Sequence, residues 1–103
     1  MIRWSPAAPA RPSCPHRRLT RLLGIELGSD VGLGQSTLRP WASANFVGAR
    51  HLFDCAAEGI SLEALSARLN AAEWRLPGHI VADVAVEPGE GAAFRVEILT
   101  VED

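Results

Sequence analysis

The apolar patterns from which this chain can build a core are confined to the residues that follow Pro40. Residues 1–40 contain six arginines, two acidic residues and five prolines, and their net charge is +4. Residues 41–103 contain four arginines and ten acidic residues, a net charge of −6, and only there do apolar residues recur with the periods of strands and helices. The sequence therefore predicts one small α+β domain over residues 39–103, preceded by a leader, residues 1–38.

The leader is predicted to be disordered, because Trp4 to Pro15 is rich in proline, alanine and arginine, and proline removes backbone donors and disfavours helix in the residue before it. The alternative is a short helix from His16 to Leu27, with leucines on one face and arginines on the other, which could contact nucleic acid or a membrane surface. Nucleic acid is not the expected partner, because all ten basic residues are arginine, as in proteins of GC-rich genomes, and the predicted domain is acidic. A further hypothesis places the natural start of translation near Val31 or Leu33, which would remove most of residues 1–30.

Five segments of the predicted domain have the pattern of extended or helical structure. They are a strand over residues 43–55, a helix from Ser61 to about Ala72, an extended segment over residues 74–76, and strands over residues 79–87 and 93–101. Ser61 suits the position before the first helical residue, where its hydroxyl can accept a backbone N–H. Pro77 and Gly78 predict a type II turn, and Pro88 to Gly91 predict the turn of a closing hairpin.

The alternation of residues predicts which side chains share a face of the sheet. In the strand over residues 93–101, Phe94, Val96 and Ile98 should face the core, whereas Leu99 and Val101 reverse the phase and indicate a bulge or burial on both faces. For the other two strands the predicted faces are listed here: Val47, Ala49, His51, Phe53 and Cys55 together; Ile80, Ala82, Val84 and Val86 on an apolar face; and His79, Val81, Asp83, Ala85 and Glu87 on a mixed face. Gly48 marks a bulge or a close approach of two backbones.

These elements predict a small antiparallel or mixed sheet with one main helix, in the order β-α-β-β, like half of a ferredoxin-like sandwich. A right-handed crossover would set the first strand parallel to a later one. One helix covers only one face of such a sheet. The other face must be polar, be covered by residues 19–40, or pack against a second copy, and the apolar area at stake favours a homodimer.

The candidate ligand-binding residues are Arg50, His51, His79 and Asp83, the polar clusters of the predicted domain. No phosphate loop, nucleophile motif or dinucleotide fingerprint is present, so no cofactor is predicted and the catalytic residues are unknown. No metal is predicted either. The alternative is a zinc site in which His51 and His79 are ligands and Asp83 or Cys55 is the third.

Three segments, NFVGARH, LPGHIVADVAV and EILTVED, resemble short uncharacterised bacterial α+β proteins over residues 39–103. That resemblance implies the domain limits and no activity. A second resemblance concerns FVGARHL, which is similar to the Phe-x-Ala-x-His strand of the 6-pyruvoyl-tetrahydropterin synthase group. This group binds zinc through three histidines and has two helices in each subunit, whereas the predicted domain has two histidines and one helix.

We therefore expect a small cytoplasmic protein that acts by self-association or by binding a protein partner that the sequence does not identify, without catalysis. The alternative is an enzyme-like domain, such as a pterin-synthase-like one, that binds a ligand or metal near His51 and His79. Cys14 and Cys55 are expected to be free thiols, and no apolar run has the length of a membrane span.

Overall fold

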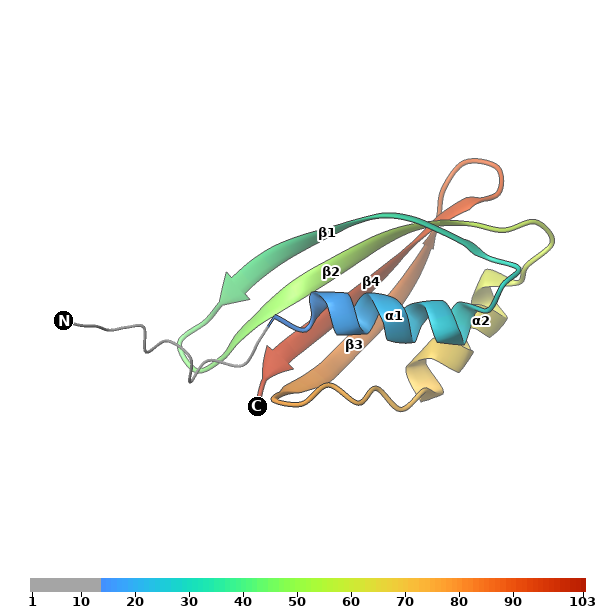
Figure 1. Ribbon diagram of the computed structural model, residues 1–103. Helices are drawn as coiled ribbons and strands as arrows, with labels where there is room; N and C mark the ends of the chain where they lie inside the picture. The colour runs from blue at the N-terminus through green and yellow to red at the C-terminus, as the bar shows by residue number, and fades with distance from the viewer. Residues whose placement is uncertain (1–13) are drawn as a thin grey trace.

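The computed structural model describes residues 14–103, which form two helices and a four-stranded sheet (Figure 1). The elements in chain order are α1 (His16–Leu27), β1 (Gly32–Ala42), β2 (Val47–Ala56), α2 (Leu62–Ala71), β3 (His79–Pro88) and β4 (Ala93–Glu102). The strand order is β1-β2-β4-β3, and every neighbouring pair is antiparallel. The predicted small α+β fold is confirmed.

β2 and β3 both run antiparallel to β4, which lies between them, so the connection through α2 sets β2 parallel to β3, as predicted. The hairpin of β3 and β4 is also confirmed. The finer comparison with half of a ferredoxin-like sandwich stays a prediction. The expected β-α-β-β order lacked two elements of the structure, the strand β1 and the helix α1.

The predicted disordered leader is wrong for the described part of that segment, since residues 16–42 form α1 and β1. Its helical alternative is confirmed: Leu19, Leu23 and Leu27 form a buried stripe of α1. The helix ends at Gly28, which has a φ of 81° that favours glycine. The rest of the prediction, for residues 1–13, lies outside the described residues.

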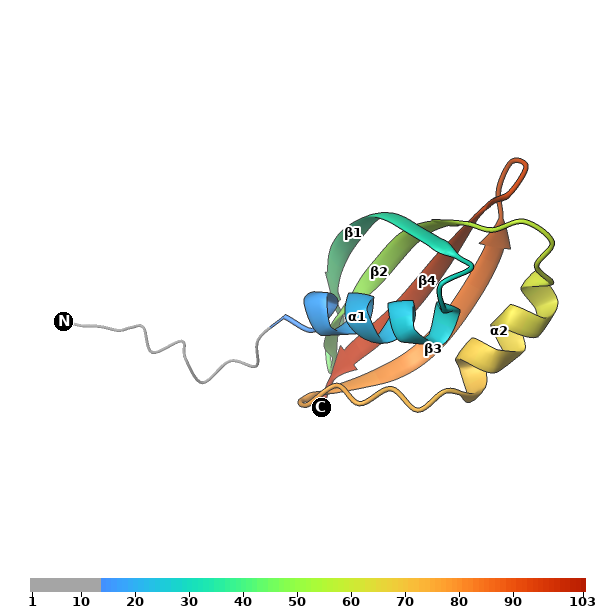
Figure 2. The ribbon, with the colours of Figure 1, turned by 45° about the vertical axis from the view of Figure 1, so that its right-hand side comes forward.

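Both helices lie on the same face of the sheet, which we call the inner face (Figure 2). They enclose the core together with side chains from β2, β3 and β4. The buried apolar residues are Leu19, Leu23, Leu27, Phe53, Cys55, Leu65, Leu69, Leu76, Val84, Phe94, Val96 and Ile98. The N-terminal third of the chain therefore completes the cover of the inner face and leaves the opposite face, the outer face, without a helix.

The predicted start of α2 and the turn before β3 are both confirmed. The Ser61 hydroxyl accepts a hydrogen bond from the Ala64 backbone N–H at 3.2 Å. At the turn, Gly78 has a φ of 81° and the His79 N–H donates to the Leu76 carbonyl at 2.9 Å. This turn sets the position at which β3 begins.

A bulge in β3 overturns the predicted alternation of that strand. Val81 pairs with Thr100 and Asp83 pairs with Leu99, so Ala82 is the extra residue. Val81 and Val84 consequently share the inner face, while Ile80 lies on the outer face and is 52% exposed. The predicted face of Ile80 and Ala82 with Val84 and Val86 is wrong for this reason, and so is the predicted shared face of His79 and Asp83.

The predicted faces of β2 and β4 are correct. His51, Phe53 and Cys55 are buried on the inner face. β4 is regular, with Leu99 and Val101 half-buried on its outer side and Thr100 buried on its inner side, which is the alternative of burial on both faces. Gly48 is a site of close approach, because a Cβ there would overlap the Thr100 carbonyl oxygen.

Candidate functional site

The four predicted site residues divide between the two faces of the sheet. Arg50 and Asp83 both oppose Leu99 from its two sides and lie on the outer face. His51 and His79 lie on the inner face. Successive residues of a strand point to opposite faces, so a single site that contains all four side chains is excluded.

His51 is completely buried and lies within a chain of polar contacts on the inner face. Its Nε2 is 2.8 Å from Thr100 Oγ1, and its Nδ1 is 2.9 Å from His16 Nδ1 in the first turn of α1. His16 Nε2 is in turn 2.9 Å from Ser36 Oγ on β1. The chain links α1 to three strands.

Two sets of tautomers satisfy these contacts with neutral rings. In one, His51 Nε2–H donates to Thr100 Oγ1 and His16 Nδ1–H donates to His51 Nδ1, so that His16 Nε2 accepts from the Ser36 hydroxyl. In the other, each of these hydrogen bonds is reversed, and the Thr100 hydroxyl donates to His51 Nε2 instead of to the Ala49 carbonyl, which is 3.4 Å away.

Burial favours the neutral form of both rings. It lowers the pKa of His51 to about 4, and repulsion from His16 and His79 acts in the same direction. Burial also lowers the pKa of His16. The His16 ring stacks on Phe53, with ring centroids 5.4 Å apart and planes 4° apart. This stacking holds the imidazole in place above the core.

A cavity of about 330 Å³ lies beside these polar contacts, at the end of the inner face that α1 does not reach. Its lining comes from the segment before α1 and from all four strands, and includes Leu38, Pro40, Val47, His79, Thr100 and Glu102. Of the four predicted residues, His79 alone lines this cavity, while His51 lies behind its wall and bonds to Thr100. The sequence prediction therefore found one lining residue and one supporting residue.

The predicted alternative of a zinc site is not supported by the described residues. Within residues 14–103, no three or more histidine, cysteine, aspartate or glutamate side chains are placed to hold a metal ion together. The Ala82 bulge puts Asp83 on the opposite face from both histidines. Cys55 is buried in the core, and burial together with Asp54 raises the pKa of its thiol to about 11. The thiol is therefore protonated at neutral pH and is a poor metal ligand.

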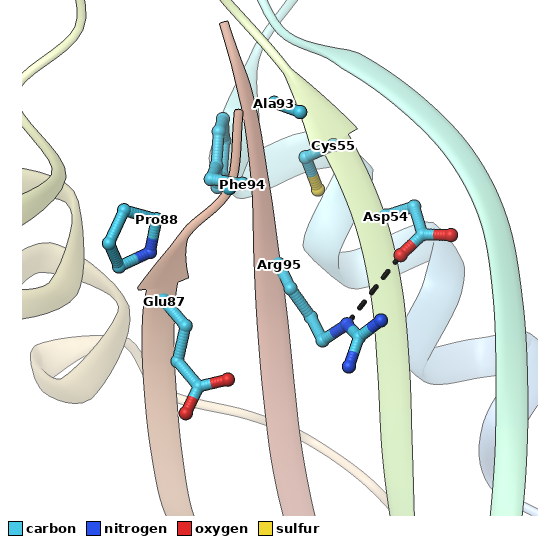
Figure 3. Close-up of a pocket in the computed structure, with 8 residues that line it drawn as sticks. Asp54, Cys55, Glu87, Pro88, Ala93, Phe94 and Arg95 are labelled. Atoms are coloured by element: carbon cyan, nitrogen blue, oxygen red, sulfur yellow. Dashed lines mark ion pairs between the residues drawn. The ribbon is translucent and has the colours of Figure 1, made fainter. Parts of the chain in front are cut away.

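A second cavity, of about 470 Å³, lies at the opposite end of the sheet, beside the β3–β4 turn (Figure 3). Arg95 lies between two acidic residues there, because it opposes Asp54 on β2 and Glu87 on β3. Arg95 Nε is 3.6 Å from Asp54 Oδ1, and all three side chains lie on the outer face. Arg95 and Asp54 form an exposed ion pair, and Glu87 leaves this group of three side chains with a net charge of −1.

The outer face changes in character along the strands. At one end, Trp41, Val101 and Ile80 form a cross-strand row with Gly48 between the first two. The next row holds Arg39, Arg50, Leu99 and Asp83, and the row after that holds Thr37, Leu52, Glu97 and Ala85. Arg50 Nη1 donates to Glu97 Oε2 at 2.7 Å. The face is thus apolar at one end and charged at the other.

Trp41 contributes an unusual polar group to this apolar end. Its ring lies against Gly48, where a Cβ would be 2.9 Å from the ring, so a side chain at position 48 would displace it. Its indole Nε1 is buried and has no hydrogen-bond partner among residues 14–103. Buried donors without acceptors are rare in folded proteins. At this end of the outer face, the Trp41 indole N–H is such a donor.

His16, Thr100 and Glu102 were not predicted as site residues. For His16 a signal exists, since it lies at i, i+3, i+7 and i+11 with Leu19, Leu23 and Leu27 on the buried stripe of α1. Thr100 and Glu102 continue the inner-face alternation of Phe94, Val96 and Ile98, but nothing in that alternation shows that they line a cavity.

Comparison with family models, with curated proteins and with solved structures finds no match to this chain. The two resemblances described above therefore stay predictions. Neither α1 nor α2 is long and apolar enough to cross a membrane, a statement that covers residues 14–103.

Proposed function

We propose that this protein acts through self-association, in which the outer faces of two copies pack against each other around a twofold axis. The observation that carries the proposal is the open outer face, on which half-buried Trp41 and Val101 and exposed Ile80 form an apolar row while both helices cover the inner face. Apolar groups that face water in contiguous rows mark interaction surfaces.

The arrangement of charge on the outer face favours a second copy as the occupant. A twofold axis parallel to the strands would place β1 of one copy over β3 of its partner and β2 over β4, with each row at the same level. Arg39 would then face Asp83, and Asp54 would face Arg95, in both directions. The apolar row would face itself, and no like charges would be opposed, so the face is self-complementary.

An axis perpendicular to the strands does not give this match. It would place the apolar row of one copy over the row that contains Asp54, Arg95 and Glu87 of the other. The Asp54–Arg95 ion pair and Glu87 would then be buried against apolar side chains and would face no opposite charge on the partner copy, which is costly. The parallel axis is therefore the arrangement we propose, with the small angle between sheets that aligned sandwiches adopt.

The size of the face is sufficient for a modest interface. Four strands that are about 4.8 Å apart and ten residues long at about 3.3 Å per residue cover about 600 Å². Two copies would bury about 1,200 Å² in total, at the lower end of the range for stable specific complexes. We therefore expect an equilibrium between monomer and dimer that depends on protein concentration.

Charge reversal across the proposed interface tests the proposal. Asp83→Arg would place two arginines face to face in each half of the interface, and Arg39→Asp would oppose two acids, so each variant should shift the equilibrium to monomer. The double variant restores opposite charges and should dimerise again. The measurement is molar mass by light scattering during size-exclusion chromatography over a range of concentrations.

Glu58→Arg is the matched control, because Glu58 is exposed in the loop before α2 and makes the same change of charge away from the sheet. It should leave the molar mass unchanged. A wild-type protein that stays monomeric at every concentration would disprove the proposal. A wild-type dimer that both single variants preserve would place the interface elsewhere on the molecule.

A further inference from the structure

We infer that the cavity between α1 and the strand ends binds a small organic cation, with an ammonium or amidinium head and a compact apolar body. This goes beyond the proposed function, because the cavity lies on the inner face and self-association is proposed on the outer one. A volume of about 330 Å³ suits a small molecule.

The polar groups that the cavity offers are acceptors. Glu102 is the charged side chain among the described residues that line it, and it directly opposes His79 across the β3–β4 pair. His79 Nδ1 is 3.3 Å from the Pro77 carbonyl oxygen, which can only accept, so Nδ1 carries the hydrogen. In the neutral ring, His79 Nε2 then has a free lone pair.

Thr100 also lines the cavity, but its side chain is completely buried and its hydroxyl is already engaged by His51 Nε2 at 2.8 Å and lies 3.4 Å from the Ala49 carbonyl oxygen, so it is not a polar group that a ligand can reach. A ligand that matches Glu102 and the neutral His79 ring must bring hydrogen-bond donors and a positive charge.

The other residues that line the cavity favour an apolar body for the ligand. Leu38 and Pro40 from β1 and Val47 from β2 provide apolar surface. Leu38 is 37% exposed and Val47 is 47% exposed, so both have apolar area left to bury. The mouth is held in place, since the Asp103 N–H donates to the Gly78 carbonyl at 2.9 Å and fastens the end of β4 to the turn before β3.

Benzamidine is a suitable probe, because it combines a planar cationic donor group with a compact apolar ring, and benzoate is its anionic counterpart of similar shape. We expect benzamidine to cause saturable shifts in the NMR signals of Leu38, Val47 and Thr100 of the full chain, and benzoate to cause none. Absence of saturable shifts with benzamidine, equal shifts with benzoate, or shifts centred on Asp54 and Arg95 would each overturn the inference.

Glu102→Gln keeps the shape of the side chain and removes its charge, so it should weaken benzamidine binding at least tenfold. Glu87→Gln is the matched control on the outer face and should leave the affinity unchanged. A Glu102→Gln protein whose NMR spectrum matches the wild type away from the cavity, and which binds benzamidine as tightly, would overturn the inference.

The variant Asp83→Arg separates this inference from the proposed self-association. Asp83 lies on the outer face, so the variant should bind benzamidine like the wild type whether or not it dimerises. Binding that is lost in Asp83→Arg and in Glu102→Gln alike would place the probe at the interface between copies and overturn the inner-face site.

Discussion

At the scale of single residues, His51 is the buried polar side chain that connects α1 to the sheet. Its imidazole is completely buried, its two nitrogens contact His16 and Thr100, and burial favours its neutral form by lowering its pKa. A proton added to His51 would change the hydrogen-bond roles of its two partners, His16 on α1 and Thr100 on β4. The polar chain therefore couples the protonation of His51 to the attachment of α1.

We expect the stability of the protein to fall on acidification between pH 6.5 and pH 4. Burial depresses the pKa of His51 from 6.5 to about 4, so the unfolded chain binds the proton more tightly and stability decreases as pH falls. The contribution is fully present above pH 6.5, and about 3 kcal/mol is lost by pH 4, since one pKa unit corresponds to about 1.4 kcal/mol. Urea unfolding at a series of pH values measures it.

His51→Gln keeps hydrogen-bonding groups at the site and cannot titrate, so its unfolding free energy should vary less with pH than that of the wild type. At pH 7 the variant should be less stable, because it does not reproduce both contacts of the ring. Parallel pH profiles for the two proteins would show that His51 is not the group responsible.

At the scale of elements, the helices and strands whose apolar residues recur at a regular spacing could be predicted from the sequence, and those without such a spacing could not. α2 and the β3–β4 hairpin were found because Leu65, Leu69, Phe94, Val96 and Ile98 repeat with the spacing of their elements. β1 escaped prediction because nearly all of its residues are exposed, so no alternation marks it; backbone pairing with β2 holds it in place. An edge strand of this kind is specified by its partner and not by burial.

The bulge in β3 escaped prediction for a different reason. Ala82 is small and fits either face of a sheet, so the sequence gives no sign that it is the extra residue. A shift of one position exchanges the faces of Ile80 and Asp83, and with them half of the predicted site. The histidine pair of the candidate site was missed because His16 lies in the segment assigned to a disordered leader.

Removal of α1 should abolish cooperative folding. A chain that starts at Val31, as the alternative start of translation would give, lacks Leu19, Leu23 and Leu27 and leaves the inner faces of β2 and β4 open. We expect residues 31–103 to show a broad thermal transition by circular dichroism. Residues 14–103 keep every described contact and should unfold as sharply as the full chain.

A single substitution in the same helix gives the finer test. Leu23→Ala in the full chain should lower the unfolding free energy by about 2–5 kcal/mol, the range for a buried leucine. Ile25→Ala is the matched control, because Ile25 lies on the same helix and is 68% exposed, so its loss should be small. Similar losses in the two variants, or a sharp transition for residues 31–103, would contradict the role given to α1.

At the scale of the whole molecule, a single sheet separates two surfaces of different character. The inner face is covered by both helices except for the cavity at His79 and Glu102, whereas the outer face carries apolar and charged rows and no cover among the described residues. A fold of two layers has one core, so its exposed sheet face is available to a partner without loss of that core.

This division predicts that thermal stability depends on protein concentration. If two copies associate through the outer face, the folded dimer is favoured over two unfolded chains by mass action, and the midpoint of thermal unfolding rises as the concentration is raised. In Asp83→Arg the midpoint should be independent of concentration, and in Glu58→Arg it should rise as in the wild type. Differential scanning calorimetry over a hundredfold range of concentration distinguishes these cases. A midpoint of Asp83→Arg that rises with concentration as it does in the wild type would mean that the outer face is not the surface that is buried.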